Sequence, residues 1–133
     1  MALLPGEAEK IAYDILSLND EILSVSLRDW RGNFLAAKSR ESFGKRFFGV
    51  NTLQGSTYSG SLAVAALSIV NEVKDVFGEP QAIITLHKDC KLMLLPMLSY
   101  EVLVGLALER SAVTEDYSLA YKIEKLLAER GDH

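Results

Sequence analysis

The alternation of apolar and polar residues predicts three consecutive strands in the C-terminal half of the chain. Apolar runs fill residues 81–87, 91–98 and 101–108 and are rich in aliphatic and β-branched side chains. The connections between the runs are two or three residues long, so successive strands must be antiparallel and form a β-meander. Pro96 has no amide hydrogen, and we expect it to mark a bulge or the end of the second strand.

A second strand pattern lies nearer the N-terminus. Residues 21–27 and 33–38 are predicted to form a hairpin, because aliphatic residues alternate with serines from Leu23 to Leu27. The residues between the two strands include Gly32, which we expect to adopt a positive φ in the turn.

Three helices are predicted where apolar residues recur at helical spacing, over 7–18, 61–77 and 117–130. The first and last carry one apolar stripe each. The middle helix is apolar over an arc of about 140°, which is wider than one contact surface needs. It is therefore expected either to meet both the sheet and a second copy of the chain or to lie deep in its own core. Gly78 and Pro80 are predicted to end it.

These elements follow the order α-β-β-α-β-β-β-α and predict an α+β fold. We expect a five-stranded antiparallel sheet, with the middle helix on one face and the N- and C-terminal helices on the other. The length of 133 residues predicts a single domain over 1–133.

Composition narrows the function classes. A net charge of −4 argues against a domain that binds nucleic acid through its overall charge. The apolar runs are far shorter than the ~18 residues of a membrane span. One cysteine cannot form an internal disulfide, and the N-terminus lacks the pattern of a signal peptide, so a cytoplasmic location is expected.

The connection over 39–60 carries a basic and aromatic cluster. Such a cluster fits a phosphate or an acidic partner, or else its phenylalanines fill the end of the core and its cations are solvated. Trp30 and Arg31 at the hairpin tip are a second candidate, where the indole ring either folds back on the strands or anchors a partner. The residues of the cluster are Arg40, Phe43, Lys45, Arg46, Phe47 and Phe48.

Candidate chemistry is sparse. His87, Asp89 and Cys90 lie together, but a metal site needs further ligands and the second histidine is the terminal His133. The same group lacks the orienting acid and oxyanion hole of a nucleophilic site. We therefore expect no catalytic residue, no metal and no cofactor.

The chain resembles the roadblock/dynein light chain family over nearly its whole length. The resemblance rests on the order of elements, on the strand-Asp-x-x-Gly-strand hairpin of 27–35, on the alanine-rich stretch 62–67, and on the strand that opens the meander. Longin and profilin-like domains are similar at this level.

The resemblance implies a non-enzymatic homodimer that serves small GTPases as a scaffold or regulator, or motor complexes as an adaptor. It implies that the middle helices pack across a two-fold axis and that the first meander strands pair edge to edge. The alternative is a small-molecule sensor of the profilin-like, PAS or GAF type, with a ligand between sheet and helix. For the dimer, the resemblance implies an interface formed by Leu62, Ala63, Ala66, Ile69, Val70, Val73, Ile83 and Thr85.

Overall fold

The computed structural model describes residues 3–48, 55–114 and 117–131, without the side chains of residues 5, 48, 55–63 and 131. No helix among these described residues is long and apolar enough to cross a membrane. The elements, in chain order, are α1 (Pro5–Leu16), β1 (Ile22–Asp29), β2 (Phe34–Ser39), α2 (Glu41–Phe48), α3 (Gly55–Phe77), β3 (Ile83–Leu86), β4 (Cys90–Met97), the short 3-10 helix η1 (Leu98–Tyr100), β5 (Val102–Glu109) and α4 (Ser118–Gly131).

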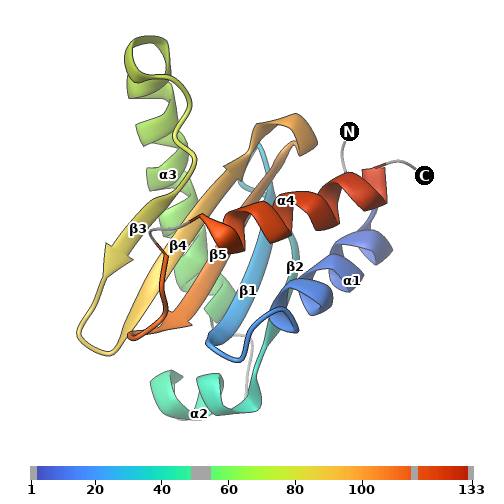
Figure 1. Ribbon diagram of the computed structural model, residues 1–133, viewed down its shortest axis with the longest axis vertical. Coiled ribbons are helices and arrows are strands. Elements are labelled where there is room, and N and C mark those ends of the chain that lie inside the picture. Colours follow the sequence, from blue (N-terminus) through green and yellow to red (C-terminus); the bar gives the residue numbers. More distant parts are fainter. Residues whose placement is uncertain (1–2, 49–54, 115–116, 132–133) are drawn as a thin grey trace.

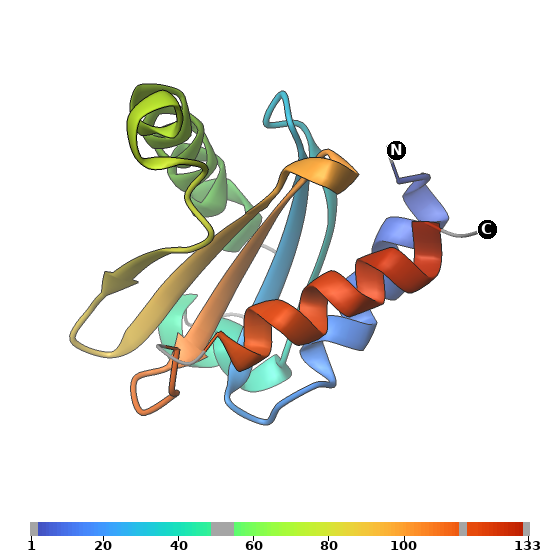
Figure 2. The ribbon, with the colours of Figure 1, turned by 45° about the horizontal axis from the view of Figure 1, so that its top comes forward.

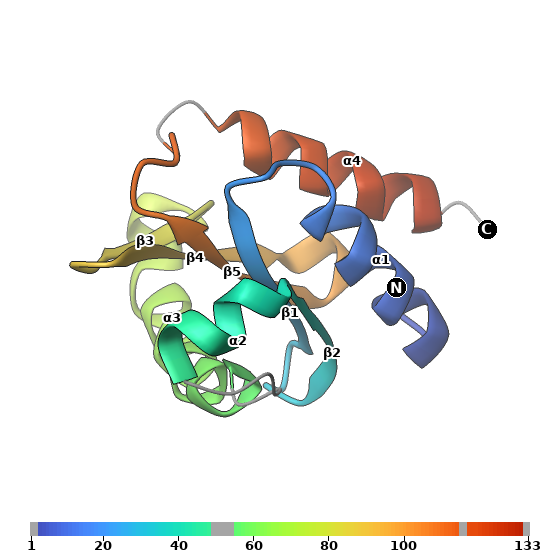
Figure 3. The same cartoon turned by 90° about the horizontal axis from the view of Figure 1, so that it is seen from below.

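The five strands form one sheet in the order β2-β1-β5-β4-β3, and every neighbouring pair is antiparallel. The hairpin β1–β2 and the meander β3–β4–β5 join where β1 pairs with β5. Helices α1 and α4 lie side by side on one face, and α3 lies on the other, with α2 across one end of the sheet (Figures 2 and 3). The predicted five-stranded α+β arrangement is confirmed.

The main core lies between the sheet and the pair α1 and α4. The apolar stripes of both helices and the aliphatic positions of β1, β4 and β5 meet there, because side chains of a strand alternate between faces. Ile11 and Ile15 of α1 and Ile123 and Leu127 of α4 are all 0 % exposed.

The contact between α3 and the sheet is smaller. Among the described side chains, Ala66 forms a cluster with Leu94 and Leu103, and Ile83 packs against it. The short side chain of Ala66 allows the helix to lie close to the strands.

Two predictions for the middle of the chain were wrong, and α1 also begins and ends two residues earlier than predicted. The connection over 39–60 contains an unpredicted helix, α2, so the order of elements is α-β-β-α-α-β-β-β-α. The middle helix begins at Gly55 instead of Ser61. Both segments have turn-like compositions, and for α2 the burial of Phe43 outweighs the weak local preference for helix.

Pro96 is accommodated within β4 without a register shift against β5, so the predicted bulge was wrong and the alternative of a strand end fits better. β4 ends at Met97, one residue later. Strand β3 begins at Ile83 opposite Leu94, so Pro96 lies where β4 has a single neighbour and a missing donor is tolerated.

Both predicted turn glycines have the expected backbone. Gly32 has φ of 89° in the β1–β2 turn, and Gly78 has φ of 87° at the end of α3. The amide of Gly78 donates to the carbonyl of Lys74 at 3.0 Å and closes the helix.

Candidate functional site

Ala66, which packs on the sheet, begins a row of apolar residues at helical spacing along α3 that continues with Val70, Val73 and Phe77. Ala66 and Val70 are each 1 % exposed, Val73 is half-buried and Phe77 is 84 % exposed. The last turns of α3 project past the sheet on the side of its edge strand β3, which leaves the end of the row uncovered (Figure 1). A row suited to packing on a sheet thus continues beyond the sheet of its own chain.

Other apolar side chains of the same region are exposed. Val76 and Phe77 of α3 are 74 % and 84 % exposed, and Ile69 is 43 % exposed. Ile84 and Leu86 of β3 are also exposed, but they alternate with Ile83, which packs toward α3, so they point to the other side of the sheet. Exposed apolar residues therefore lie on both sides of the sheet edge that β3 forms.

The outer edge of β3 has unpaired backbone groups. The amide of His87 donates to the carbonyl of Cys90 at 2.9 Å, and hydrogen-bonded pairs alternate along an antiparallel ladder. The amides of Ile84 and Leu86 therefore point away from β4, and that of Thr85 points toward it. No charged residue lies between 81 and 86, so the edge lacks the usual protection against pairing with another strand.

The residues predicted for a dimer interface fall into three groups. Ala66 packs against Leu94 and Leu103 of the sheet, and Val70 is equally buried, so neither offers exposed surface to a second copy. The side chains of Leu62 and Ala63 lie outside the described residues. At least partly exposed are Ile69, Val73, Ile83 and Thr85.

Helix α2 holds the predicted basic and aromatic cluster against the end of the sheet. Phe43 is 4 % exposed and packs with Leu23 and Ala107. Its ring centroid lies 5.2 Å from that of Phe47, and the guanidinium of Arg46 lies 4.9 Å from the Phe47 centroid. The predicted filling of the core end by phenylalanine is confirmed for Phe43. The side chain of Phe48 lies outside the described residues.

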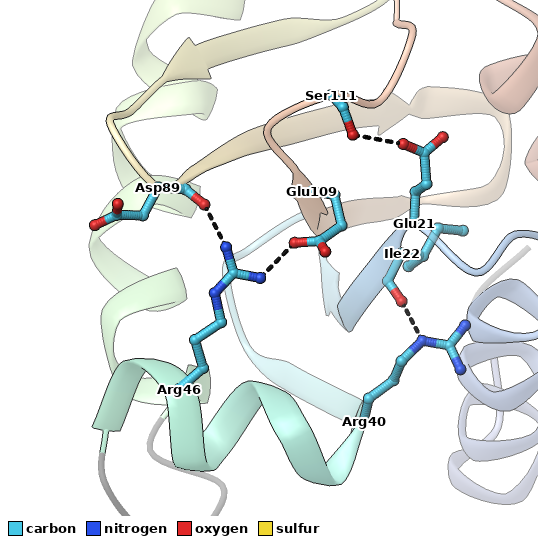
Figure 4. A network of polar contacts seen from close by, with 7 residues as sticks. All are labelled: Glu21, Ile22, Arg40, Arg46, Asp89, Glu109 and Ser111. Atoms are coloured by element: carbon cyan, nitrogen blue, oxygen red, sulfur yellow. Dashed lines mark hydrogen bonds and ion pairs between the residues drawn. The ribbon is translucent and has the colours of Figure 1, made fainter.

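Arg46 ties α2 to two other elements. Its Nη2 donates to the carbonyl of Asp89 in the β3–β4 turn at 3.0 Å, and its Nη1 forms an ion pair with the carboxylate of Glu109 at the end of β5 (Figure 4). Lys45 pairs with Glu41 one turn earlier at 3.1 Å, and both side chains are exposed. Lys45 is therefore more accessible to a partner than Arg46.

Arg40 has a structural role that the sequence did not predict. Its Nε donates to the carbonyl of Ile22 at 2.6 Å (Figure 4), and its Nη2 donates to the carbonyls of Leu16 and Asn19 at 2.8 and 3.0 Å. Leu16 is the last residue of α1, so Arg40 satisfies a helix-end carbonyl and fixes the end of β2 beside it. The expectation of a solvated Arg40 was wrong.

A groove of about 410 Å³ runs between α2 and the β3–β4 turn. Phe43, Phe47 and Leu92 form its apolar wall, and Lys88 contributes to its polar side. Cys90 also lines it, and burial raises the pKa of its thiol, with Asp89 and Glu109 adding to this and Arg46 opposing it. A thiol that stays protonated is a weak nucleophile, so the groove is better suited to binding than to covalent chemistry.

The β1–β2 turn is held by one carboxylate. Asp29 accepts hydrogen bonds from the amides of Arg31 and Asn33, both at 2.9 Å, and from the side-chain amide of Asn33 at 3.0 Å. Trp30 is half-buried and Arg31 is exposed. Among the described residues, no three His, Cys, Asp or Glu side chains are grouped so that they could hold a metal.

Sequence reasoning missed the helical form of α2 and the exposure of Phe77. A signal for α2 was present, because Phe43 and Phe47, and likewise Glu41 and Lys45, are four residues apart. No comparable signal marks where the sheet ends beneath α3.

No protein-family model and no curated protein matches the chain. Solved structures match its fold. The gliding protein MglB from Thermus thermophilus is 16 % identical with a TM-score of 0.68, over 99 % of this chain and 94 % of that one. A roadblock/LC7 domain from Streptomyces avermitilis is 11 % identical with a TM-score of 0.64, over 93 % and 94 %. MglB from Myxococcus xanthus is 12 % identical with a TM-score of 0.63, over 96 % and 94 %. The chain therefore has the roadblock fold.

Proposed function

We propose that this chain is a non-enzymatic homodimeric interaction module that serves a small GTPase as a regulator or scaffold. The row of α3 that runs past its own sheet carries this proposal. In the dimer, the β3 strands of two copies pair at their free edges and two sheets become one. Val73 and Phe77 then lie against the neighbouring copy instead of water.

The energetics favour such an assembly. Burying a large apolar side chain contributes about 1.5–3 kcal/mol, and a two-fold axis uses every contact twice. Association costs roughly 4–15 kcal/mol in lost freedom, which several such residues together with new β3–β3 hydrogen bonds can offset. A monomer would instead leave both an apolar surface and an open strand edge in water.

The structural neighbours support self-association. A structure described as MglB with tetrameric arrangement, 15 % identical to this chain with a TM-score of 0.65, shows that a protein of this fold can assemble with itself. Service to a small GTPase is what the resemblance to roadblock domains implies. The sensor alternative has less support, because the core between the sheet and the pair α1 and α4 is filled by aliphatic side chains.

The assembly is tested by light scattering at micromolar concentration. We expect the mass of a dimer for the unaltered chain and of a folded monomer for Phe77→Glu, because a charge cannot be buried cheaply without a partner. Val113→Glu is the matched control, since Val113 is also exposed but lies between β5 and α4. A monomeric unaltered chain, or a dimeric Phe77→Glu, would contradict the proposed interface.

Amide hydrogen exchange tests the strand pairing. The amides of Ile84 and Leu86 should be protected in the unaltered chain and exchange faster in Phe77→Glu. The amide of Thr85 points toward β4 and should be protected in both, which makes it an internal control. Fast exchange at Ile84 in a confirmed dimer would show that the copies meet elsewhere.

We further propose that the partner meets the groove beside α2, where Lys45 and Phe47 are accessible. Small GTPases of the source organism, loaded with GDP or a GTP analogue, are titrated by calorimetry. Lys45→Glu with Phe47→Ala should weaken binding at least about tenfold, or roughly 1.4 kcal/mol. Lys122→Glu on α4, across the sheet, is the control.

Two outcomes would contradict parts of this proposal. If a GTPase binds with unchanged affinity to the groove variant, Trp30→Ala and Arg31→Glu at the hairpin tip are the next variants. If no GTPase binds to an intact dimer, the GTPase role is rejected while the self-association remains.

A further inference from the structure

A second depression, of about 350 Å³, lies on the α4 side of the molecule. Its walls are the connection from α3 to β3, the 3-10 turn between β4 and β5, and the first two turns of α4. Three tyrosines line it, Tyr100 from the 3-10 turn and Tyr117 and Tyr121 from the start of α4. We call it the tyrosine pocket.

The charged residues that line the tyrosine pocket are all acidic among the described residues. Glu79 and Glu124 line it, and no lysine, arginine or histidine does so among the described residues. Within the same part of the chain, neither carboxylate has an ion-pair partner. Two uncompensated carboxylates beside aromatic rings favour a cation and disfavour an anion.

The backbone holds the aromatic wall in place. Tyr117 has φ of 59°, in the left-handed region that a bulky residue rarely adopts, and its carbonyl accepts from the amide of Tyr121 at 3.0 Å. Tyr117, Tyr121 and Glu124 follow at helical spacing, so they lie along one side of α4. Residues in such a conformation cluster at binding sites, where the surrounding structure maintains them.

We propose that the tyrosine pocket binds the guanidinium group of an arginine side chain presented by a protein partner. A planar guanidinium stacks on aromatic rings and donates two parallel hydrogen bonds to a carboxylate, and the pocket offers both groups. The volume of about 350 Å³ accommodates one long side chain. This inference goes beyond the proposed function, because it assigns a ligand group to a separate pocket. The walls from α4 and the 3-10 turn lie away from α3 (Figure 3), while residues 79–81 directly follow Phe77 of the proposed interface.

The test is a nuclear magnetic resonance titration of the full chain with a blocked Gly-Arg-Gly peptide. Saturable shifts are expected at Tyr117, Ala120, Tyr121 and Glu124, with an affinity in the millimolar range. The same peptide with citrulline in place of arginine keeps the shape and loses the charge, and it should bind at least about fivefold more weakly.

Two variants assign the binding to named groups. Glu124→Gln should weaken binding of the arginine peptide about fivefold, and Glu129→Gln, on another side of α4, should leave it unchanged. Tyr117→Asn removes the ring while keeping a residue that tolerates positive φ, and it should also weaken binding about fivefold. Shifts elsewhere, no saturable shift, or equal binding of the citrulline peptide would overturn the proposal.

Discussion

The two faces of the sheet differ in how well the helices of the same chain bury them. On the α1–α4 face, β1 contributes Val25 and Leu27, and both are 0 % exposed. On the α3 face, the alternate positions of the same strand are serines, and Ser26 pairs with Gly105 of β5, which stays partly exposed. The first face carries large aliphatic residues on sheet and helices alike. The second carries serines on β1 and Gly105 on β5, and Leu94 and Leu103 are its large buried residues in contact with Ala66 of α3.

This difference assigns a separate task to each face. Large side chains on both layers bury each other and close the α1–α4 core within one chain. The cluster beneath α3 is small and involves Ala66 of the helix, and Ile69, Val76 and Phe77 of α3 stay exposed. One face therefore holds most of the buried core, and the other carries the exposed apolar residues on which the proposed association rests.

The largest difference in the free energy of unfolding is expected when one isoleucine on each side of the sheet is replaced by alanine. Ile15→Ala empties a fully buried site and should lower the free energy of unfolding by about 3 kcal/mol. Ile69→Ala, at a position 43 % exposed, should lower it by less than about 1 kcal/mol. Urea unfolding in the Phe77→Glu background keeps self-association out of the measurement. Equal losses would mean that α3 is packed as tightly as α1.

A second comparison concerns polar contacts, because the hydrogen bonds of Arg40 connect the end of β2 to the end of α1. Arg40→Ala leaves the carbonyls of Leu16, Ile22 and Asn19 without their donor and should cost about 2–3 kcal/mol. Lys45→Ala removes an exposed ion pair and should cost less than about 0.5 kcal/mol. A small loss for Arg40→Ala would show that water replaces its bonds.

Much of this contrast could be read from the residues before the structure was known. The alternation in β1 predicted a strand with one apolar and one serine face. The wide apolar arc of the middle helix predicted either two contact surfaces or a helix buried deep in its own core. The arc alone does not reveal which residues face the sheet, because a rotation of the helix exchanges them. Ala66 and Val70 were therefore predicted for the dimer interface, although they are buried within the chain.

Other features depend on contacts that no local pattern encodes. Eight residues including Gly44 have little tendency to form a helix alone, and α2 forms where Phe43 can pack against Leu23 and Ala107. Arg40 belongs to a basic cluster in the sequence, but its guanidinium meets carbonyls more than 15 residues away along the chain. The tyrosine pocket joins segments separated by some forty residues, and its signal appears only after folding.

A smaller effect is expected on the α3 face at Gly105. A Cβ atom there would lie 2.6 Å from the Oγ atom of Ser26, which is too close for an ordinary contact. Gly105→Ala should cost about 1 kcal/mol, and adding Ser26→Ala should restore most of it. The comparison is a double-mutant cycle measured by urea unfolding. An unchanged cost in the double variant would place the strain elsewhere.

The smallest effect is expected at the β1–β2 turn, which belongs to neither face. Burial raises the pKa of Asp29, but hydrogen bonds from Asn33 and Arg31, with the charge of Arg31, outweigh it and hold the pKa below its ordinary value. A lowered pKa means that the folded chain favours the carboxylate, so this stabilisation is present above the unfolded pKa and is lost as pH falls through the folded one. The free energy of unfolding should therefore drop between about pH 6 and pH 3 by slightly more in the unaltered chain than in Asp29→Asn. The difference should stay below about 1 kcal/mol, because solvent screens a carboxylate at a turn. An identical pH dependence in both chains would mean that the hydrogen bonds at this turn do not depend on the charge of Asp29.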